Sequence, residues 1–313
     1  MSNASRPTHR THDLVVGVDG TPAGANALRY AMKESALSGG TVEVVHVVPD
    51  YAPLAGMYPI AAAELMEAGR AALETTLREV GTSTSGARVV TLLKRGAVVK
   101  TLATAGEHAL EIVVGSDRRP VSSRLFTGNV STGVAASAAV PVVSVPETWS
   151  AERETGTVLV GVKRYDQSDA LLAEAFEVAR RRGSRLVILH AWRFPSAYDA
   201  VIVSDPATLA EWGERAQSEL EDHLAPWRQS HPDVAVELRC RHDHSAQALV
   251  HASADADELV IARKAHGFPA AAHLGSTART VLLYAHCPVR VVPRVHQSVT
   301  PDLELEASGS ELT

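Results

Sequence analysis

Two loops in the first half of the chain carry residues suited to binding an anion. Asp19-Gly20-Thr21-Pro22 follows one short apolar run; Gly115-Ser116 follows another and leads through a long loop to Gly128-Asn129-Val130-Ser131, at the expected start of a helix. The N–H groups at a helix start attract negative charge, and glycine lets backbone approach a phosphate closely. These loops therefore predict a phosphate-binding site.

The loops lie between alternating strand-like and helix-like segments. Apolar runs of strand length occupy residues 14–18, 42–48, 89–93, 112–114 and 142–145, and again 158–162, 186–191, 234–238, 259–262 and 289–292. Apolar residues recur at helical spacing within 23–31, 65–80 and 172–179. Unbroken apolar strands separated by helices indicate a parallel sheet covered on both faces. The prediction is an α/β fold of two tandem five-stranded, parallel, doubly wound domains.

The two halves correspond at a period of one whole domain. A shift of 144 places His46 on His190, and a shift of 147 places Gly128 on Gly275. We therefore expect domains at 13–147 and 157–294, a polar linker at 148–156 that does not force one orientation, a flexible tail at 1–12 and a flexible acidic tail at 295–313.

Composition excludes several classes of protein. The chain has 313 residues, of which 45% are hydrophobic, and a formal net charge of -6. No apolar run approaches the roughly 20 residues of a membrane span, and no signal peptide is recognisable. Cys240 and Cys287 show no metal-ligand spacing and are expected to be reduced, buried thiols. We expect a soluble, cytoplasmic protein with neither nucleic acid nor membrane as partner.

Catalytic and metal-binding motifs are absent from the sequence. It contains no Walker loop, no Gly-x-Ser-x-Gly and no His-Glu-x-x-His. His242-Asp243-His244 lacks a third ligand and is expected to be a surface loop. His46 and His190 occupy matched strand ends, which favours a structural role. The sequence thus predicts a binding protein with no catalytic residue and no metal site.

The VGVDG segment at 16–20, the His-Val pair after the second strand, the glycine loop and the closing Ala-x-x-Pro-Val resemble the universal stress protein family in its tandem form. The likeness covers almost all of 13–147 and 157–294. Because members of this fold commonly pair through the last strand, it also implies that 142–145 and 289–292 join either the two domains or two chains. It implies Rossmann-like domains similar to adenine nucleotide alpha hydrolases and a role in the stress response. It further implies weak binding of ATP or AMP, with Mg²⁺ only as part of the bound nucleotide, and action through conformation or partners, among them a homodimer and an unknown protein.

The resemblance also suggests which residues bind the nucleotide. The family pattern is Gly-x2-Gly-x9-Gly-(Ser/Thr), with an aspartate after the first strand and a small apolar residue facing adenine. Carried over to this chain, it implies a site made of Asp19, Val47, Gly115, Gly128, Val130 and Ser131, with departures at Arg118 and Asn129. Arg118 in place of a glycine costs about 1–2 kcal/mol if the backbone there is left-handed. Attraction between its guanidinium and a phosphate would offset about the same amount.

The second half departs further from the family pattern. Lys163 replaces the aspartate, so a donor faces the adenine amino group at a cost of about 1–3 kcal/mol, or roughly 5- to 150-fold in affinity. Ala262 and Ala265 replace glycines, and Gly275-Ser276 remain, while Arg263 and Lys264 keep the loop basic. We expect nucleotide mainly in the first domain, and a structural role or another anion in the second.

Simpler roles compete with these assignments. Asp19 is equally a turn residue, with Thr21 as helix N-cap and Pro22 as first helical residue. Gly115 and Gly128 would also serve tight turns, and Ser122, Ser123 and Ser131 could accept phosphate. For the whole chain, the alternatives are a nucleotide-free interaction protein with degenerate sites, and a slow ATPase or phosphotransferase acting at residues 115–131.

Overall fold

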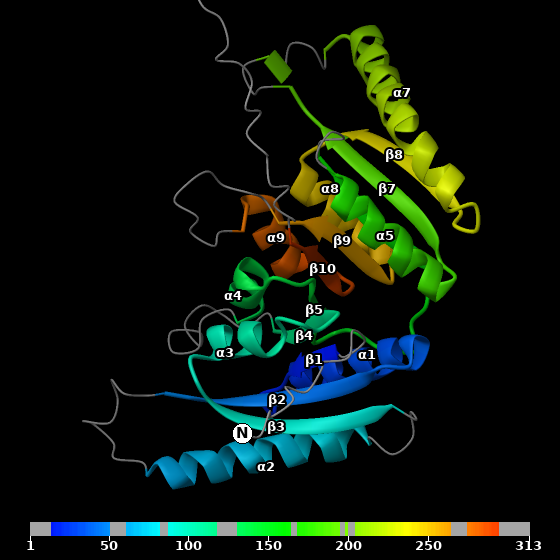
Figure 1. Cartoon of the computed structure of the whole chain (residues 1–313). Helices are drawn as coiled ribbons and strands as arrows, with labels where there is room; N and C mark the ends of the chain where they lie inside the picture. The colour runs from blue at the N-terminus through cyan, green and yellow to red at the C-terminus, as the bar shows by residue number, and fades with distance from the viewer. Residues whose placement is uncertain are drawn as a thin grey trace, which may run out of the picture.

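The computed structural model describes residues 14–50, 61–81, 87–117, 130–163, 168–194, 198–199, 204–263 and 274–293. Within them, ten strands form one sheet in the order β3-β2-β1-β4-β5-β10-β9-β6-β7-β8 (Figure 1). The predicted tails at 1–12 and 295–313 lie outside the described residues.

Each half contributes five parallel strands, as the sequence predicts. The first half contains β1 (Leu14–Gly17), α1 (Pro22–Ser38), β2 (Thr41–Pro49), α2 (Ala62–Val80), β3 (Arg88–Gly96), α3 (Val98–Ala105), β4 (Glu111–Ser116), α4 (Val130–Ser137) and β5 (Val142–Pro146). The second contains β6 (Thr157–Val162), α5 (Asp169–Arg182), β7 (Arg185–Trp192), α7 (Pro206–Ser230), β8 (Val236–His242), α8 (Ser245–Ala252), β9 (Glu258–Ala262), α9 (Ser276–Tyr284) and β10 (Val289–Val292). The inner strands are buried on both faces, which is why they are mainly apolar, whereas the outermost strands β3 and β8 are only partly buried.

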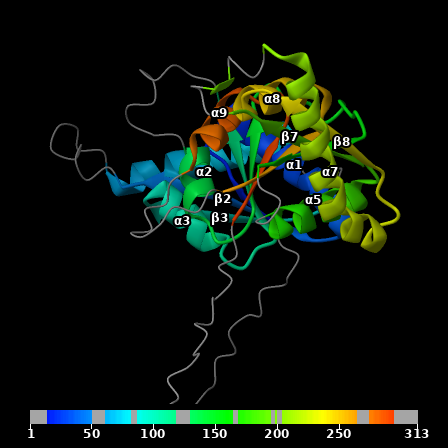
Figure 2. The same ribbon diagram turned by 90° about the horizontal axis from the view of Figure 1, so that it is seen from above.

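The helices cover both faces of the sheet, and they cover them differently. On one face, α3, α4, α8 and α9 share a single apolar core that runs through both halves. On the other, α1 and α2 cover one core while α5 and α7 cover a second. Figure 2 shows α5 and α7 on one side of the second half, with α8 and α9 on the other. The shared core is the first of several features that join the halves.

The two domains join within the chain through their last strands. β5 and β10 are antiparallel, with Arg290 opposite Val143, whereas all other pairings in the sheet are parallel. Of the two pairings considered from the sequence, this structure has the intramolecular one. The outermost strands of the sheet are β3 and β8. The expected homodimer stays a prediction.

A buried network of charges crosses this junction. Arg290 of β10 is only 1% exposed, and its guanidinium contacts Glu111 of β4, Glu258 of β9 at 2.5 Å and Glu174 of α5 at 3.0 Å. Arg182 of α5 lies 2.6 Å from Glu34 of α1 and 2.5 Å from Glu258. Burial alone would raise the pKa of Glu258, but the charges of Arg182 and Arg290 lower it to about 2. The buried carboxylates of both halves are therefore neutralised by arginines of the second half.

The linker is held by both halves. The Asn26 amide donates to the carbonyls of Glu147 and Trp149 at 2.8 and 3.0 Å, and the Thr155 N–H donates to Asp257 at 2.6 Å. The Trp149 ring meets the edge of Tyr30 with 5.7 Å between centroids. The expectation that the linker leaves the orientation open is therefore wrong, because its polar groups bond to α1 and to the residue before β9.

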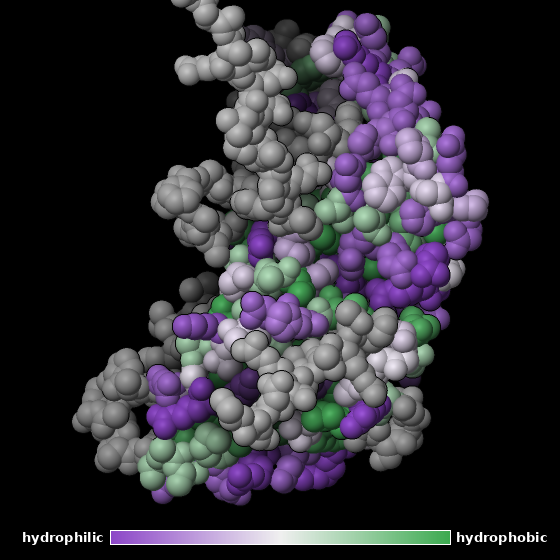
Figure 3. All heavy atoms as spheres, viewed as in Figure 1, coloured by the Kyte–Doolittle hydropathy of each residue, from purple (hydrophilic) through white to green (hydrophobic). Residues whose placement is uncertain are grey.

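Two expectations about second-half elements need correction. β8 begins at Val236 and extends to His242, so it starts two residues later than expected and includes a histidine assigned to a surface loop. The apolar spacing predicts no helix over 206–230, because only Leu220 and Leu224 of the 25-residue helix α7 are buried and its outer surface is hydrophilic (Figure 3). Among the described residues, none of the helices combines the length and the apolar character needed to cross a membrane.

Candidate functional site

Asp19 lies at the carboxyl end of β1, in the turn that starts α1. Its Oδ1 accepts from the Thr21 N–H at 3.1 Å and from the Thr21 hydroxyl at 2.5 Å, while the Thr21 oxygen accepts from the Gly24 N–H at 3.2 Å. Thr21 is the N-cap and Pro22 follows at the start of the helix, which confirms the simpler expectation for this turn. The left-handed φ of +79° at Gly20 suits glycine. The Asp19 residue itself is exposed at the sheet edge.

The two matched histidines make the same contact in both halves. His46 Nδ1 lies 2.8 Å from the Val18 carbonyl oxygen, and His190 Nδ1 lies 3.0 Å from that of Val162. Each ring thus ties the end of the second strand to the residue just before Asp19 or Lys163. This confirms the structural role expected for both histidines. It also fixes the backbone of the two halves alike where their side chains differ.

Gly115 is required by packing. A Cβ built on it would lie 2.4 Å from the Ala23 backbone and 2.8 Å from Gly24 N, so α1 begins almost in contact with the end of β4. The same turn holds Asp19, whose Oδ1 would lie 3.0 Å from a Cβ on Gly24. The structure therefore brings together two of the predicted site residues, Asp19 and Gly115. It gives Gly115 a steric role that neither a turn nor a phosphate explains.

The other predicted residues of the first half are only partly described. Arg118, Gly128 and Asn129 lie outside the described residues, as do Ser122 and Ser123. α4 begins at Val130, and Ser131 in its first turn is buried. Val47 is buried in the core beneath α3 and α4. Because α4 connects two parallel strands, its N-terminal end lies at the same sheet edge as Asp19.

In the second half, different side chains stand at the carboxyl ends of the strands. Lys163 is exposed where Asp19 stands in the first half, and Gly275 is the N-cap of α9, with Ser276 as its first residue. Arg263 donates from Nη1 to the carbonyls of Ala136 and Ala138 at 3.1 and 2.7 Å. Its guanidinium therefore caps the C-terminal end of α4 in the other half, and burial lowers its pKa. Lys264 and Ala265 lie outside the described residues.

Sequence reasoning missed a polar and aromatic cluster at the end of β7. Asp199 is 4% exposed, and its carboxylate contacts Arg193 and His242 Nε2, the latter at 2.7 Å. The Arg193 hydrogen bond is the main cause that lowers the pKa of Asp199 to about 2. The rings of Trp192, Phe194, Trp212 and His242 pack against one another in this cluster.

No group of three or more potential metal ligands occurs in the described part of the chain. Cys287 is buried as expected, whereas Cys240 is only partly buried.

The fold and these sheet-edge loops define a tandem α/β protein with two Rossmann-like domains. The sequence pattern of the universal stress protein family matches residues 11–146 and again 154–293. The chain belongs to the universal stress protein family.

Individual relatives agree with this assignment. The chain is 30% identical over 295 residues to a universal stress protein of Mycolicibacterium smegmatis, covering 90% of this chain and 97% of the relative. It is 30% identical over 289 residues to one of Mycobacterium tuberculosis, covering 89% and 95%. The crystal structure of a universal stress protein from Archaeoglobus fulgidus has a TM-score of 0.65 at 17% identity and covers 91% and 97% of the two chains. The tandem arrangement therefore extends over nearly the full length of these relatives.

Proposed function

We propose that this chain is a cytoplasmic stress-response regulator that binds ATP or AMP weakly, mainly in its first half, and acts through conformation or protein partners. One observation carries the proposal. The two histidine contacts fix equivalent backbone in both halves, yet an exposed carboxylate follows in the first and an exposed ammonium in the second. Only the carboxylate can accept from an adenine amino group.

The surroundings of Asp19 fit an adenine nucleotide. The Asp19 carboxylate is already oriented by Thr21, so little side-chain freedom remains to be lost on binding. The N-terminal end of α4 lies at the same edge and supplies N–H groups suited to phosphate oxygens. The predicted anion ligands Arg118 and Asn129 lie in the segment just before that helix. Binding of a nucleotide by these groups requires no catalytic base, so we propose binding without turnover.

Titration calorimetry with ATP tests the site. We expect Asp19→Ala to weaken ATP binding roughly 5- to 150-fold, because the lost acceptor leaves the adenine amino group unpaired. Lys163→Ala is the matched control in the second half and should leave the affinity within a factor of two or so. Thermal melting of each variant without ATP shows whether the turn has survived the substitution. Equal ATP affinity in Asp19→Ala and the parent protein would remove the site from the first half.

A second candidate function is a nucleotide-free interaction protein. It is favoured by the other tasks of the predicted site residues, because Gly115 makes room for α1 and Arg263 caps α4. This candidate requires that denatured, purified protein releases no nucleotide on chromatography. It also requires that ATP leaves the melting temperature unchanged, whereas a ligand that binds the folded state raises it.

A further inference from the structure

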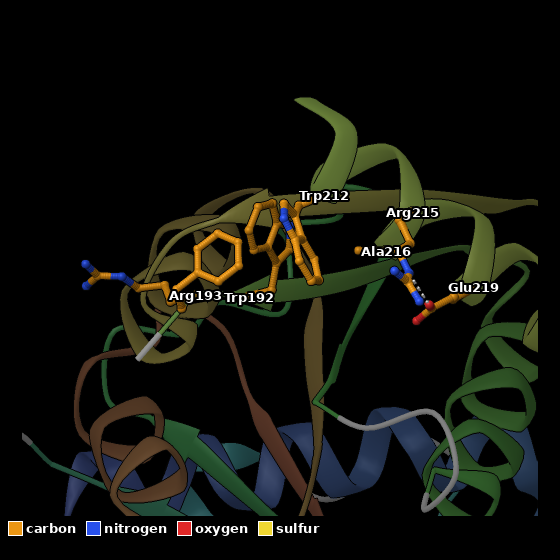
Figure 4. A pocket seen from close by; sticks show the side chains of 7 residues that line it. Trp192, Arg193, Trp212, Arg215, Ala216 and Glu219 are labelled. Atoms are coloured by element: carbon orange, nitrogen blue, oxygen red, sulfur yellow. Dashed lines mark hydrogen bonds and ion pairs between the residues drawn. The ribbon is translucent and has the colours of Figure 1, made fainter. Parts of the chain in front are cut away.

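Three aromatic side chains of the second half line an open pocket beside the carboxyl end of β7. The pocket encloses about 250 Å³ and is lined by Trp192, Arg193, Phe194, Trp212, Arg215, Ala216 and Glu219. Figure 4 shows the two indoles on one side, Arg215 and Glu219 on the other, and Ala216 between them. The pocket thus has an apolar wall and a polar wall that face each other.

The aromatic wall is held in a fixed shape. Phe194 meets Trp192 and Trp212 edge to face, with centroids 5.5 and 5.2 Å apart. The His242 ring packs on Trp192 at 4.8 Å, and its Nε2 bonds to the buried carboxylate of Asp199. Such perpendicular contacts favour one arrangement of the rings, so a ligand would meet a surface already formed.

The polar wall offers hydrogen bonds without net charge. Arg215 Nε donates to Glu219 Oε1 at 3.1 Å, and the Arg215 guanidinium lies 5.7 Å from the centre of the Trp212 ring. At the far end, Arg193 is paired with Asp199. Because each arginine is matched by a carboxylate, the pocket has no net attraction for an anion. It presents N–H donors and a carboxylate acceptor to a neutral molecule.

Packing alone does not explain these aromatics. Trp212 is 43% exposed, and two of the chain's four tryptophans and one of its four phenylalanines line this pocket. The first half has the same fold without aromatic residues at the equivalent place. Its β2 ends in Val47-Val48-Pro49, and its α2 contains no aromatic residue. Exposed, rigidly held rings at the carboxyl edge of a parallel sheet are typical of a binding site.

We propose that this pocket binds a flat, uncharged nitrogen heterocycle of one or two rings, the chemical class to which nucleobases belong. The ring stacks on the Trp192 and Trp212 indoles, while its acceptors and N–H groups meet Arg215 and Glu219. The volume lies just below the range of common ligand pockets, which suits a single ring system rather than a larger molecule. The site is separate from Asp19 and lies in the half that lost the aspartate.

Adenosine and guanosine are the probes for this site. We expect either nucleoside to change tryptophan fluorescence, excited at the long-wavelength edge of indole absorption, in a saturable manner. Trp212→Leu should weaken the binding roughly 5- to 150-fold, the usual range for loss of one stacking aromatic. Arg215→Ala, which leaves the rings in place, should also weaken it, while Arg228→Ala on the same helix is the matched control. Calorimetry with the same nucleosides checks the affinities independently of fluorescence.

The Asp19→Ala variant separates this site from the proposed nucleotide site. Nucleoside binding that survives in Asp19→Ala but is lost in Trp212→Leu supports the pocket, whatever ATP does in the first half. Absence of saturable binding of both nucleosides overturns the proposal. Binding that is equal in the parent protein and in a folded Trp212→Leu, as judged by its melting curve, also overturns it.

Discussion

Replacing Arg290 with methionine is expected to lower the free energy of unfolding by about 3–5 kcal/mol. The guanidinium of Arg290 contacts Glu111, Glu174 and Glu258, and it is almost completely buried. Arg182 still neutralises Glu258 in the variant, but Glu111 is left buried without a cation. Urea unfolding followed by circular dichroism measures the loss. An exposed pair gives the matched control, because Arg180→Met removes only the surface contact with Glu177 and should cost at most about 1 kcal/mol.

The second variant of the pair identifies the cause. Glu111 is the carboxylate most dependent on Arg290, and its Oε1 is buried without a hydrogen-bond partner in the described structure. Adding Glu111→Gln to Arg290→Met removes the uncompensated charge, so the double variant should recover part of the lost stability. A loss below about 1 kcal/mol in Arg290→Met, or no recovery in the double variant, would show that the network does not hold the halves together.

The network illustrates what the sequence does and does not reveal. Glu111 and Glu258 stand at matched positions as the first residues of β4 and β9, and Arg290 interrupts a run of valines. A charged residue in a buried strand requires a partner. The repeat predicts both domains and their strands, because most strands contain an apolar run of strand length. It leaves open whether the last strands join the two domains or two chains, since the exposure of a strand edge cannot be read from the sequence.

The candidate site was predictable to a similar extent. The family resemblance implies that Asp19 and Gly115 belong to one site, and the carboxyl ends of parallel strands share one edge of the sheet. In the structure β1 pairs with β4, so the two strand ends that carry these residues are neighbours. The aromatic pocket was not predictable, because Trp192 and Phe194 are separated from Trp212 by a loop and belong to different elements. The nucleotide assignment itself stays a prediction until ATP binding is measured.

Gly115→Ala should distinguish packing from ligand binding at the first-half site. The added methyl would lie 2.4 Å from the Ala23 backbone, so α1 must move away from β4, and we expect a loss of about 1–3 kcal/mol in unfolding free energy. Gly213→Ala on α7 is the control of opposite sign, because its methyl meets only Trp192 at 3.8 Å and alanine favours a helix.

Comparison with ATP affinity then separates the two roles of Gly115. If Gly115 serves only the packing of α1, Gly115→Ala should displace the turn that orients Asp19 and thereby also weaken ATP binding. Ala262→Gly in the second half should leave ATP affinity unchanged. Wild-type stability in Gly115→Ala would contradict the steric role, because no real side chain tolerates a contact of this length with backbone. Normal stability with reduced ATP affinity would instead assign Gly115 to the phosphate, as the family pattern implies. The stability measurement is therefore the decisive one, since only the packing role requires it to change.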